Sequence, residues 1–301
     1  MKRILVLGKG LVGESIKSYF ENSPNEIRAC STEEVDLRVL SEVEAELRRF
    51  NPDIAIYAAG VSGGIQANLQ ESGSLAIENL LMMSNFFYAA RGIELPELIN
   101  LVPACVYPGS LKKNMTPKDL FTGPMEESSL GYSTSKLAGL VTCQAIAKQE
   151  GLSWKSVIVT NLYGTSRDNI KTKPHVIPDL VNKFSLAKKQ SLKEVELLGS
   201  GLPVRDFLHV SDLGIAVETI LKYKGDETVI NVSGSGAVTI AQLARKIAKI
   251  VDYKGAIRFN GKDLDGTDYK VLDGTLLGSL GWEAKTSLDQ GLKSILNQQM
   301  I

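Results

Sequence analysis

Two side chains with complementary chemistry lie four residues apart near the middle of the chain. Residues 132–136 read Tyr-Ser-Thr-Ser-Lys, and the apolar run that follows predicts a helix. Residues four apart on a helix share one face, so the phenol of Tyr132 and the ammonium of Lys136 would point the same way. An ammonium beside a phenol favours the phenolate and would lower the tyrosine pKa from about 10. The pair is a candidate proton donor to a carbonyl, although an exposed helix can place these residues at this spacing by chance.

The start of the chain predicts a dinucleotide-binding turn. A short apolar strand over residues 3–7 meets Gly8, Gly10 and Gly13, and a helical pattern then continues to about residue 21. Strand, glycine turn and helix in this order let a pyrophosphate approach backbone N–H groups at the helix N-terminus. The alternative is an ordinary turn between a strand and a helix. The position of the motif at the start of an alternating strand and helix pattern favours the cofactor site.

The end of the second predicted strand, near residues 26–31, bears on which dinucleotide binds. The strand ends in Ser31 and Thr32 rather than in a carboxylate. An acid there would accept a hydrogen bond from the ribose 2′-OH of NAD, whereas small hydroxyls leave room for a 2′-phosphate. The sequence therefore favours NADP(H) as cofactor, with NAD(H) as the alternative.

The remaining pattern predicts an α/β fold, a Rossmann-type doubly wound parallel sheet with a smaller mixed α/β C-terminal domain for the substrate. Further strands are expected near residues 53–58, 98–102, 154–160 and 229–232. We expect a dinucleotide-binding domain over residues 1–164, to which 203–233 return, and a mainly substrate-binding domain over 165–301. Residues 109–130 are irregular and would lie over the site. Ser41 and Thr239 are each predicted to cap the N-terminus of a helix.

Two predicted helices, over residues 74–90 and 131–149, are apolar around much of their circumference. Such helices must be covered on both sides, by the sheet and by something else. We expect a homodimer in which both helices pack against their copies. The alternative is that other segments of the same chain cover them.

Composition excludes several classes of partner. Thirty-four basic residues balance thirty-four acidic ones in 301 residues, so no net charge attracts nucleic acid or an anionic membrane. The three widely spaced cysteines give neither a disulfide framework nor a metal-binding pattern. The apolar run at the N-terminus is too short for a signal peptide, and no run is long enough to cross a bilayer. We expect a soluble cytoplasmic protein without a metal site.

Taken together, these motifs resemble the extended short-chain dehydrogenase/reductase family, and within it the GDP-L-fucose synthases. The resemblance covers nearly the whole chain. It is carried by residues 10–13 (Gly-Leu-Val-Gly), 36–38 (Asp-Leu-Arg), 63–68 (Gly-Gly-Ile-Gln-Ala-Asn), 105–108 (Cys-Val-Tyr-Pro), 132–136, 161–164 (Asn-Leu-Tyr-Gly), 175–178 (His-Val-Ile-Pro), 205–208 (Arg-Asp-Phe-Leu) and 280–282 (Leu-Gly-Trp). The Tyr/Lys pair and the glycine turn mark only the superfamily, whereas the Gly-Gly-Ile, Cys-Val-Tyr-Pro and His-Val-Ile-Pro stretches are more specific.

The resemblance implies a nucleotide-sugar substrate and an NAD(P)-dependent epimerase/reductase acting on a 4-keto-6-deoxy-hexose. A ketone at C4 acidifies the protons at C3 and C5, so one base and one acid can invert both centres. By resemblance Cys105 is that base and His175 the acid, while Tyr132 protonates the 4-oxygen during reduction and Lys136 also holds the nicotinamide ribose. Taken alone, Cys105 could equally be a buried apolar cysteine and His175 a residue that bonds backbone at a helix start. His209 is expected to be structural.

The resemblance also implies two sets of contacts. The cofactor would contact Gly8, Lys9, Gly10, Leu11, Val12, Gly13, Ser31, Asp36, Leu37, Ala58, Ala59, Gly60, Tyr132, Lys136, Asn161, Leu162 and His175. The substrate would contact Gly64, Cys105, Val106, Asn161, Lys183, Leu198 and Arg205.

Three positions depart from the family pattern. The family's catalytic serine is replaced by Pro103, with Ala104 following, so neither residue offers a side-chain donor to the 4-oxygen. Leu198 replaces a tryptophan near the nucleotide base, which puts guanine in question. The glycine turn is one residue shorter than the family's, which removes a position that helps to hold a 2′-phosphate. Two alternatives therefore stay open: an enzyme that keeps only the epimerase activity, and a degenerate member that binds dinucleotide as a sensor.

Overall fold

The computed structural model describes residues 1–63, 65–165, 175–261 and 265–299 of the chain. Six strands form its central sheet in the order β2-β1-β3-β4-β5-β9, and every neighbouring pair is parallel. Their bounds are β1 (Arg3–Leu7), β2 (Glu26–Cys30), β3 (Ile54–Tyr57), β4 (Glu97–Pro103), β5 (Ser153–Val159) and β9 (Val229–Val232). Most of their residues are buried, which is why they are continuous apolar runs in the sequence. The predicted α/β fold is confirmed.

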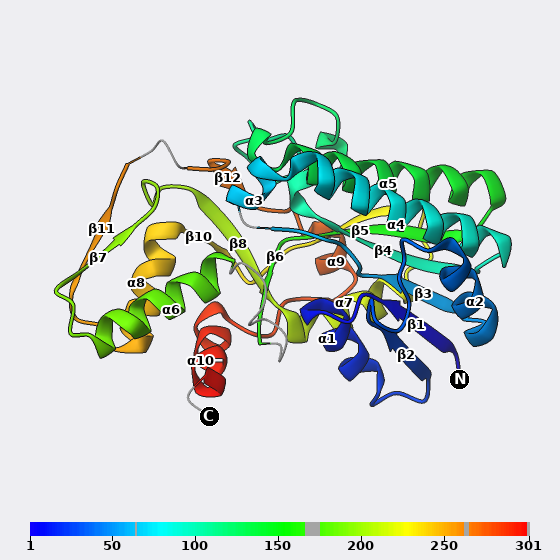
Figure 1. The fold of residues 1–301 in the computed structure, drawn as a ribbon. Helices are drawn as coiled ribbons and strands as arrows, with labels where there is room; N and C mark the ends of the chain where they lie inside the picture. Colours follow the sequence, from blue (N-terminus) through cyan, green and yellow to red (C-terminus); the bar gives the residue numbers. More distant parts are fainter. Residues whose placement is uncertain (64, 166–174, 262–264, 300–301) are drawn as a thin grey trace.

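Helices cover both faces of this sheet (Figure 1). One face carries α2 (Leu40–Phe50), α4 (Ser72–Gly92) and α5 (Leu130–Glu150), and the other carries α1 (Leu11–Phe20), α7 (Leu213–Lys222) and α9 (Thr275–Ser279). The side chains of β1 alternate between the two cores, Leu5 and Leu7 facing the first and Ile4 and Val6 the second.

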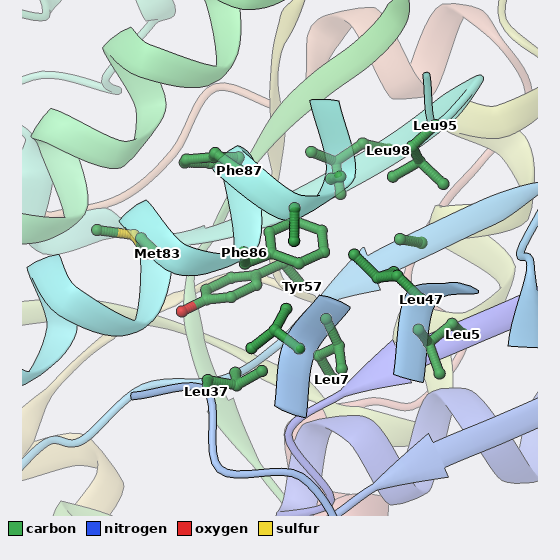
Figure 2. Packing of buried hydrophobic residues seen from close by; sticks show 14 of the residues in the cluster. Leu5, Leu7, Leu37, Leu47, Tyr57, Met83, Phe86, Phe87, Leu95 and Leu98 are labelled. Carbon is green, nitrogen blue, oxygen red and sulfur yellow. The ribbon is translucent and has the colours of Figure 1, made fainter. Parts of the chain in front are cut away.

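The first of these cores is rich in aromatic rings (Figure 2). The ring centroids of Tyr57 and Phe86 lie 5.0 Å apart, and those of Phe87 and Trp154 lie 6.0 Å apart. These contacts join the end of β3 to the middle of α4 and the start of β5. Such packing holds the carboxyl end of β3 rigidly, and that end carries part of the site described below.

A second group of elements lies beside the carboxyl ends of the parallel strands (Figure 1). Strand β8 (Val204–His209) pairs with β6 (Asn161–Tyr163), β10 (Ala237–Thr239) and β12 (Tyr269–Lys270), and β7 (Glu194–Leu197) pairs with β11 (Ala256–Phe259). Helices α6 (Val176–Lys189), α8 (Ile240–Val251) and α10 (Leu288–Gln299) share a core with them.

The sequence predicted that residues 203–233 return to the central sheet, and the structure agrees only in part. Strand β9 completes that sheet, but β8, which the sequence assigned to the same returning segment, belongs to the second sheet. Leu277 and Trp282 pack into the core of α1 and α7, a second return that we did not anticipate. The domain boundaries themselves remain a prediction.

The two predicted helix caps have different outcomes. Thr239 accepts a hydrogen bond from the N–H of Gln242 at 3.0 Å and completes a capping box, as predicted. The prediction for Ser41 is wrong, because α2 begins at Leu40 with Val39 as its N-cap and has no side-chain cap. A preceding turn competes there, since the carboxylate of Glu42 accepts from the N–H of Asp36 at 2.8 Å.

Remaining short elements are α3 (Ile65–Gln70) and the 3₁₀ turns Ala104–Val106, Pro117–Asp119, Glu127–Ser129 and Val210–Asp212. Within the described residues, no helix combines the length and the apolar character that crossing a bilayer requires.

Candidate active site

Tyr132 and Lys136 lie on the first two turns of α5 and face the end of β3. The ammonium nitrogen of Lys136 donates a hydrogen bond of 2.8 Å to the carbonyl of Ala59. It lies 5.8 Å from the centroid of the Tyr132 ring and 5.6 Å from that of Tyr57. Lys136 is only 3% exposed. The expected shared face of the helix is confirmed, and it points into the protein rather than into solvent.

Burial reverses the expected effect on the tyrosine. Desolvation raises the pKa of Tyr132 above its ordinary value of 10, and nearby Cys105 and Tyr57 raise it further. The same desolvation lowers the pKa of Lys136 to about 8. The predicted fall in the tyrosine pKa is therefore wrong for this chain, because removal of the phenol from water is the largest effect on it. Tyr132 is held as a neutral phenol, which is the form that can donate a proton.

Gly60 makes room for the lysine. A Cβ atom at this position would stand 2.6 Å from the ammonium nitrogen of Lys136 and 3.2 Å from the side-chain oxygen of Asn79. The fully buried Asn79 fixes the adjoining loop, since it donates to the carbonyl of Val61 at 2.8 Å and accepts from its N–H at 3.1 Å. The loop after β3 is thus shaped around the ammonium group.

Cys105 reaches the same place from another strand. It stands in the 3₁₀ turn directly after β4 and is partly exposed. Burial raises the pKa of its thiol, while Lys270, a hydrogen bond from Ser133 and Lys136 act in the opposite direction. Its charge also raises the pKa of Tyr132. A phenol, a thiol and an ammonium, delivered by two separate elements, therefore converge at the carboxyl ends of β3 and β4.

A partly buried ion pair lies near the thiol, and the sequence did not predict it. Lys270 on β12 and Glu126 lie 3.0 Å apart, and Thr267 donates to the same carboxylate at 2.8 Å. Burial alone would raise the pKa of Glu126, but Lys270, Thr267 and Ser128 outweigh it and lower that pKa to about 2. Nothing in the local sequence marks Glu126 or Lys270, because they meet only through the packing of the irregular segment on β12.

Arg205, a predicted substrate contact, lies beside this ion pair. Burial lowers the pKa of its guanidinium, and Glu126 acts against that shift. Its one side-chain hydrogen bond among the described residues is to the carbonyl of Val204, at 2.9 Å. Most of the five donors of this guanidinium thus remain available to a ligand.

The glycine turn is closely packed at Gly8 and Gly13 and open at Gly10. Gly8 has a φ of +99°, and its Cβ would stand 2.7 Å from the backbone of Ala59. A Cβ on Gly13 would come within 1.9 Å of the Gly8 carbonyl oxygen, whereas one on Gly10 would meet open space. Gly10 is the N-cap of α1 and provides no side-chain cap. The first N–H groups of α1 therefore have no side-chain cap at the N-cap position, an arrangement in which a helix N-terminus can bind an anion.

Other predicted cofactor contacts vary in what they can offer. Leu37 has its side chain in the hydrophobic core, so only its backbone can contact a ligand. Asp36 is paired with Arg38 at 2.8 Å. Asn161 donates to the carbonyl of Asp206 at 2.7 Å.

The sequence predicted that no carboxylate lies at the end of β2, and this prediction is wrong. Glu34 folds back toward the end of that strand, where its carboxylate accepts a hydrogen bond from the N–H of Ser31 at 2.9 Å.

The substrate contacts are less closely assembled. Val106 is buried and can offer only backbone. Lys183 is paired with Asp179 at 3.0 Å, and Leu198 is 61% exposed. Gly64 lies outside the described residues.

His175 is the N-cap of α6 and makes no side-chain cap bond. Neighbouring protein desolvates its ring and lowers its pKa, although the residue as a whole is exposed. Within the part of the chain that the structure describes, no hydrogen bond or ion pair joins it to Tyr132 or Cys105. The structure thus brings Tyr132, Lys136 and Cys105 together, and the role of His175 remains a prediction.

The sequence of the chain is similar to those of known proteins. Residues 4–233 match the model of the NAD dependent epimerase/dehydratase family. GDP-L-fucose synthase from Sinorhizobium fredii is 35% identical over 292 residues, which cover 97% of this chain and 93% of that protein. GDP-L-fucose synthase from Escherichia coli is 33% identical over 304 residues, which cover 97% and 95%.

A solved structure agrees in fold. MlghC, a GDP-mannoheptose C4 reductase from Campylobacter jejuni with NADP bound, superimposes with a TM-score of 0.88 at 24% identity and covers 100% of this chain and 98% of that one. The family match spans most of the chain, including the glycine turn, Cys105 and the Tyr132–Lys136 pair. On these grounds the chain belongs to the NAD dependent epimerase/dehydratase family.

Proposed function

We propose that this chain is an NADP(H)-dependent epimerase/reductase that acts on a GDP-linked 4-keto-6-deoxy-hexose. The observation that carries the proposal is the convergence of Tyr132, Lys136 and Cys105 at one edge of the sheet. An epimerisation beside a ketone followed by reduction of that ketone requires a base and a proton donor at neighbouring atoms of one sugar. The activity named for the relatives, GDP-L-fucose synthase, is of this kind.

NADP(H) fits the glycine turn. A Cβ at Gly8 or Gly13 would clash with neighbouring backbone, so only glycine fits at these two positions. The N-terminus of α1 has no side-chain cap, and its N–H groups would bind the pyrophosphate. When bound, the dinucleotide supplies or accepts the hydride of the reaction. Lys136, which donates a hydrogen bond to the carbonyl of Ala59, would hold the nicotinamide ribose. The bound NADP of the Campylobacter jejuni reductase supports the phosphorylated form as the cofactor.

Epimerisation falls to Cys105 in this proposal. The ketone at C4 acidifies the protons at C3 and C5, and the thiolate of Cys105 removes them in turn. Lys270 and Ser133 favour that thiolate against the cost of burial. His175 returns a proton from the other side of the ring.

Reduction falls to Tyr132. Its phenol is neutral because burial raises its pKa, so it carries the proton that the 4-oxygen requires. Lys136 keeps a positive charge at neutral pH with a pKa of about 8, and this charge stabilises the phenolate left after transfer. Arg205, with donors to spare, would bind the diphosphate of the substrate.

The direct test is to supply NADPH with GDP-4-keto-6-deoxy-mannose and to follow the loss of reduced-nicotinamide absorbance. We expect oxidation of the cofactor in proportion to the sugar consumed, and none when the ketone is omitted. The absence of oxidation with any 4-keto nucleotide sugar would refute the reductase assignment.

One observation favours a second candidate, an epimerase that no longer reduces. Pro103 and the buried Ala104 offer no side-chain donor where the family places its serine, and loss of one such donor typically costs about 10²–10³ in rate. In deuterated water this candidate would place deuterium at C3 or C5 without any oxidation of NADPH.

Assembly as a homodimer is part of the proposal. Helix α4 exposes Ile77 and Tyr88, at 67% and 66%, and α5 exposes Val141 on the same side of the sheet. A second copy would cover this apolar surface, as the sequence predicts. Light scattering should give twice the chain mass for the wild type and the single mass for Ile77→Glu; a monomeric wild type would contradict it. The cytoplasmic location remains a prediction of the sequence.

A further inference from the structure

A backbone hydrogen bond joins the glycine turn to the end of β2, and this contact brings two opposite charges close together. The N–H of Gly8 donates to the carbonyl of Cys30 at 3.1 Å. This bond places Lys9, the next residue of the turn, beside the segment that begins at Ser31. The ammonium of Lys9 then lies 3.7 Å from the carboxylate of Glu34, and both side chains are 37% exposed.

Glu34 is held in this position as a carboxylate. It accepts from the N–H of Ser31 at 2.9 Å. That backbone hydrogen bond is the main reason why its pKa lies below the ordinary value, and the Ser31 hydroxyl and the charges of Lys9 and Arg28 contribute in the same direction. Lys17, on α1, also interacts with this charge. The carboxylate is therefore ionised at neutral pH, and about a third of the side chain is exposed to solvent.

Closing the turn does not by itself explain the ion pair. The turn that begins at Ser31 is already closed by backbone bonds, in which Glu34 and Val35 donate to the Ser31 carbonyl at 3.1 and 3.0 Å. Lys9 comes from a different element and contributes nothing to that turn. An exposed pair of this kind is worth at most about 1 kcal/mol of stability. What distinguishes it is its place in the fold.

That place is where a Rossmann sheet meets the adenosine ribose of a dinucleotide. In this fold the end of the second strand faces the ribose 2′ position, where a carboxylate accepts a hydrogen bond from the 2′-OH of NAD and a cation binds the 2′-phosphate of NADP. Here both groups are present and neutralise each other. A 2′-phosphate would bind Lys9 and break its ion pair with Glu34. A 2′-hydroxyl would donate a hydrogen bond to a carboxylate oxygen of Glu34 and leave that ion pair intact.

We propose that Lys9 and Glu34 together set the choice between NADPH and NADH: Lys9 binds the 2′-phosphate, Glu34 binds the 2′-hydroxyl, and their pairing keeps discrimination between the two cofactors weak. The inference rests on the proposed function only in that a dinucleotide binds at the glycine turn. It does not depend on the sugar, on Cys105 or on Tyr132.

The test is equilibrium binding of NADPH and of NADH to the full chain, followed by nicotinamide fluorescence without any sugar. Lys9→Met should raise the Kd for NADPH about tenfold or more, because the variant loses one charge-assisted contact with the 2′-phosphate. The Kd for NADH should be nearly unchanged. Glu34→Gln should do the opposite, raising the Kd for NADH and lowering that for NADPH. The matched control is Glu33→Gln, which removes the same charge from the adjacent exposed residue and should leave the ratio of the two Kd values as in the wild type.

Three results would overturn the inference. One is a Kd ratio that Lys9→Met and Glu34→Gln leave unchanged, and another is a ratio that both variants shift in the same direction. A third is a shift that Glu33→Gln reproduces, which would reduce the effect to net charge. Binding of neither nucleotide by the wild type would reject the dinucleotide site altogether. That result differs from failure of the proposed sugar chemistry, which would leave both Kd values intact.

Discussion

The two sides of the candidate site are built in different ways. On the cofactor side, the glycine turn and the loop after β3 follow directly on parallel strands of one sheet, so topology alone brings them to one edge. On the substrate side, Glu126, Arg205 and Lys270 come from segments separated by up to 144 residues, and they meet only through packing. The comparison suggests that the cofactor side is rigid and locally encoded, whereas the substrate side depends on long-range contacts.

The largest effect is expected from Tyr132→Phe. Removing the phenol oxygen takes away the proton donor for the 4-oxygen and should lower the reduction rate by about 10²–10⁴. Because Lys136 remains anchored on Ala59, NADPH binding should be unchanged. Tyr223→Phe, at the C-cap of α7, is the matched control and should reduce as the wild type does. A wild-type rate in Tyr132→Phe would remove the phenol from the mechanism.

A glycine pair tests the rigidity of the cofactor side. Alanine at Gly13 would place its Cβ 1.9 Å from the Gly8 carbonyl, so Gly13→Ala should destabilise the chain by about 3 kcal/mol and abolish NADPH binding. Alanine at Gly73 on α4 would meet no atom within 4 Å, and Gly73→Ala should stabilise it by about 0.5–1 kcal/mol. Urea unfolding of both variants gives the comparison. Equal changes in the free energy of unfolding for the two variants would mean that the turn can adjust to a Cβ at Gly13 and is not rigid.

The ion pair on the substrate side should show a pH signature. The pKa of Glu126 is about 2 in the folded chain against an ordinary 4.5, so its stabilisation is fully present above pH 4.5 and is lost as the pH falls toward 2. Glu126→Gln should therefore cost about 2 kcal/mol at pH 7 and progressively less in acid, as measured by unfolding at several pH values. A cost that does not change between pH 7 and pH 3 would exclude this assignment.

The smallest effects are expected at the two helix caps. Thr239→Ala removes a hydrogen bond to the N–H of Gln242 and should cost about 1 kcal/mol. Ser41→Ala should change the free energy of unfolding by a few tenths of a kcal/mol, since Ser41 lies inside α2 and caps nothing. Thermal unfolding of the two variants distinguishes them, and a larger loss of stability for Ser41→Ala would mean that Ser41 caps the N-terminus of α2.

Local pattern was enough to predict most of the cofactor side. Strand ends, glycines and the four-residue spacing of Tyr132 and Lys136 are properties of short segments, and parallel strands carry them to one edge. Even there, burial changed the chemistry, because the sequence predicted a lowered tyrosine pKa and desolvation raised it. Glu34 was overlooked for a related reason: β2 ends at Cys30, four residues before it, and only the fold of the turn brings its carboxylate back to Ser31.

The substrate side could be predicted only by resemblance. Arg205 and Cys105 were named from family motifs, but the ion pair of Glu126 and Lys270 that borders them has no sequence signature. Its partners are a residue in an irregular segment and a residue on a two-residue strand. The competing turn at Asp36, which displaced the expected cap at Ser41, shows the same limit on a smaller scale.

The central claim is that the Cys105 thiol and the Tyr132 phenol act on one sugar in one site. The most direct measurement is mass spectrometry of the sugar after incubation of Tyr132→Phe with NADPH and GDP-4-keto-6-deoxy-mannose in deuterated water. The account predicts that deuterium enters at C3 and C5 while the ketone persists, since the base is intact and the proton donor is missing. A reduced sugar without deuterium would contradict it, and so would exchange at C3 and C5 that survives in Cys105→Ala.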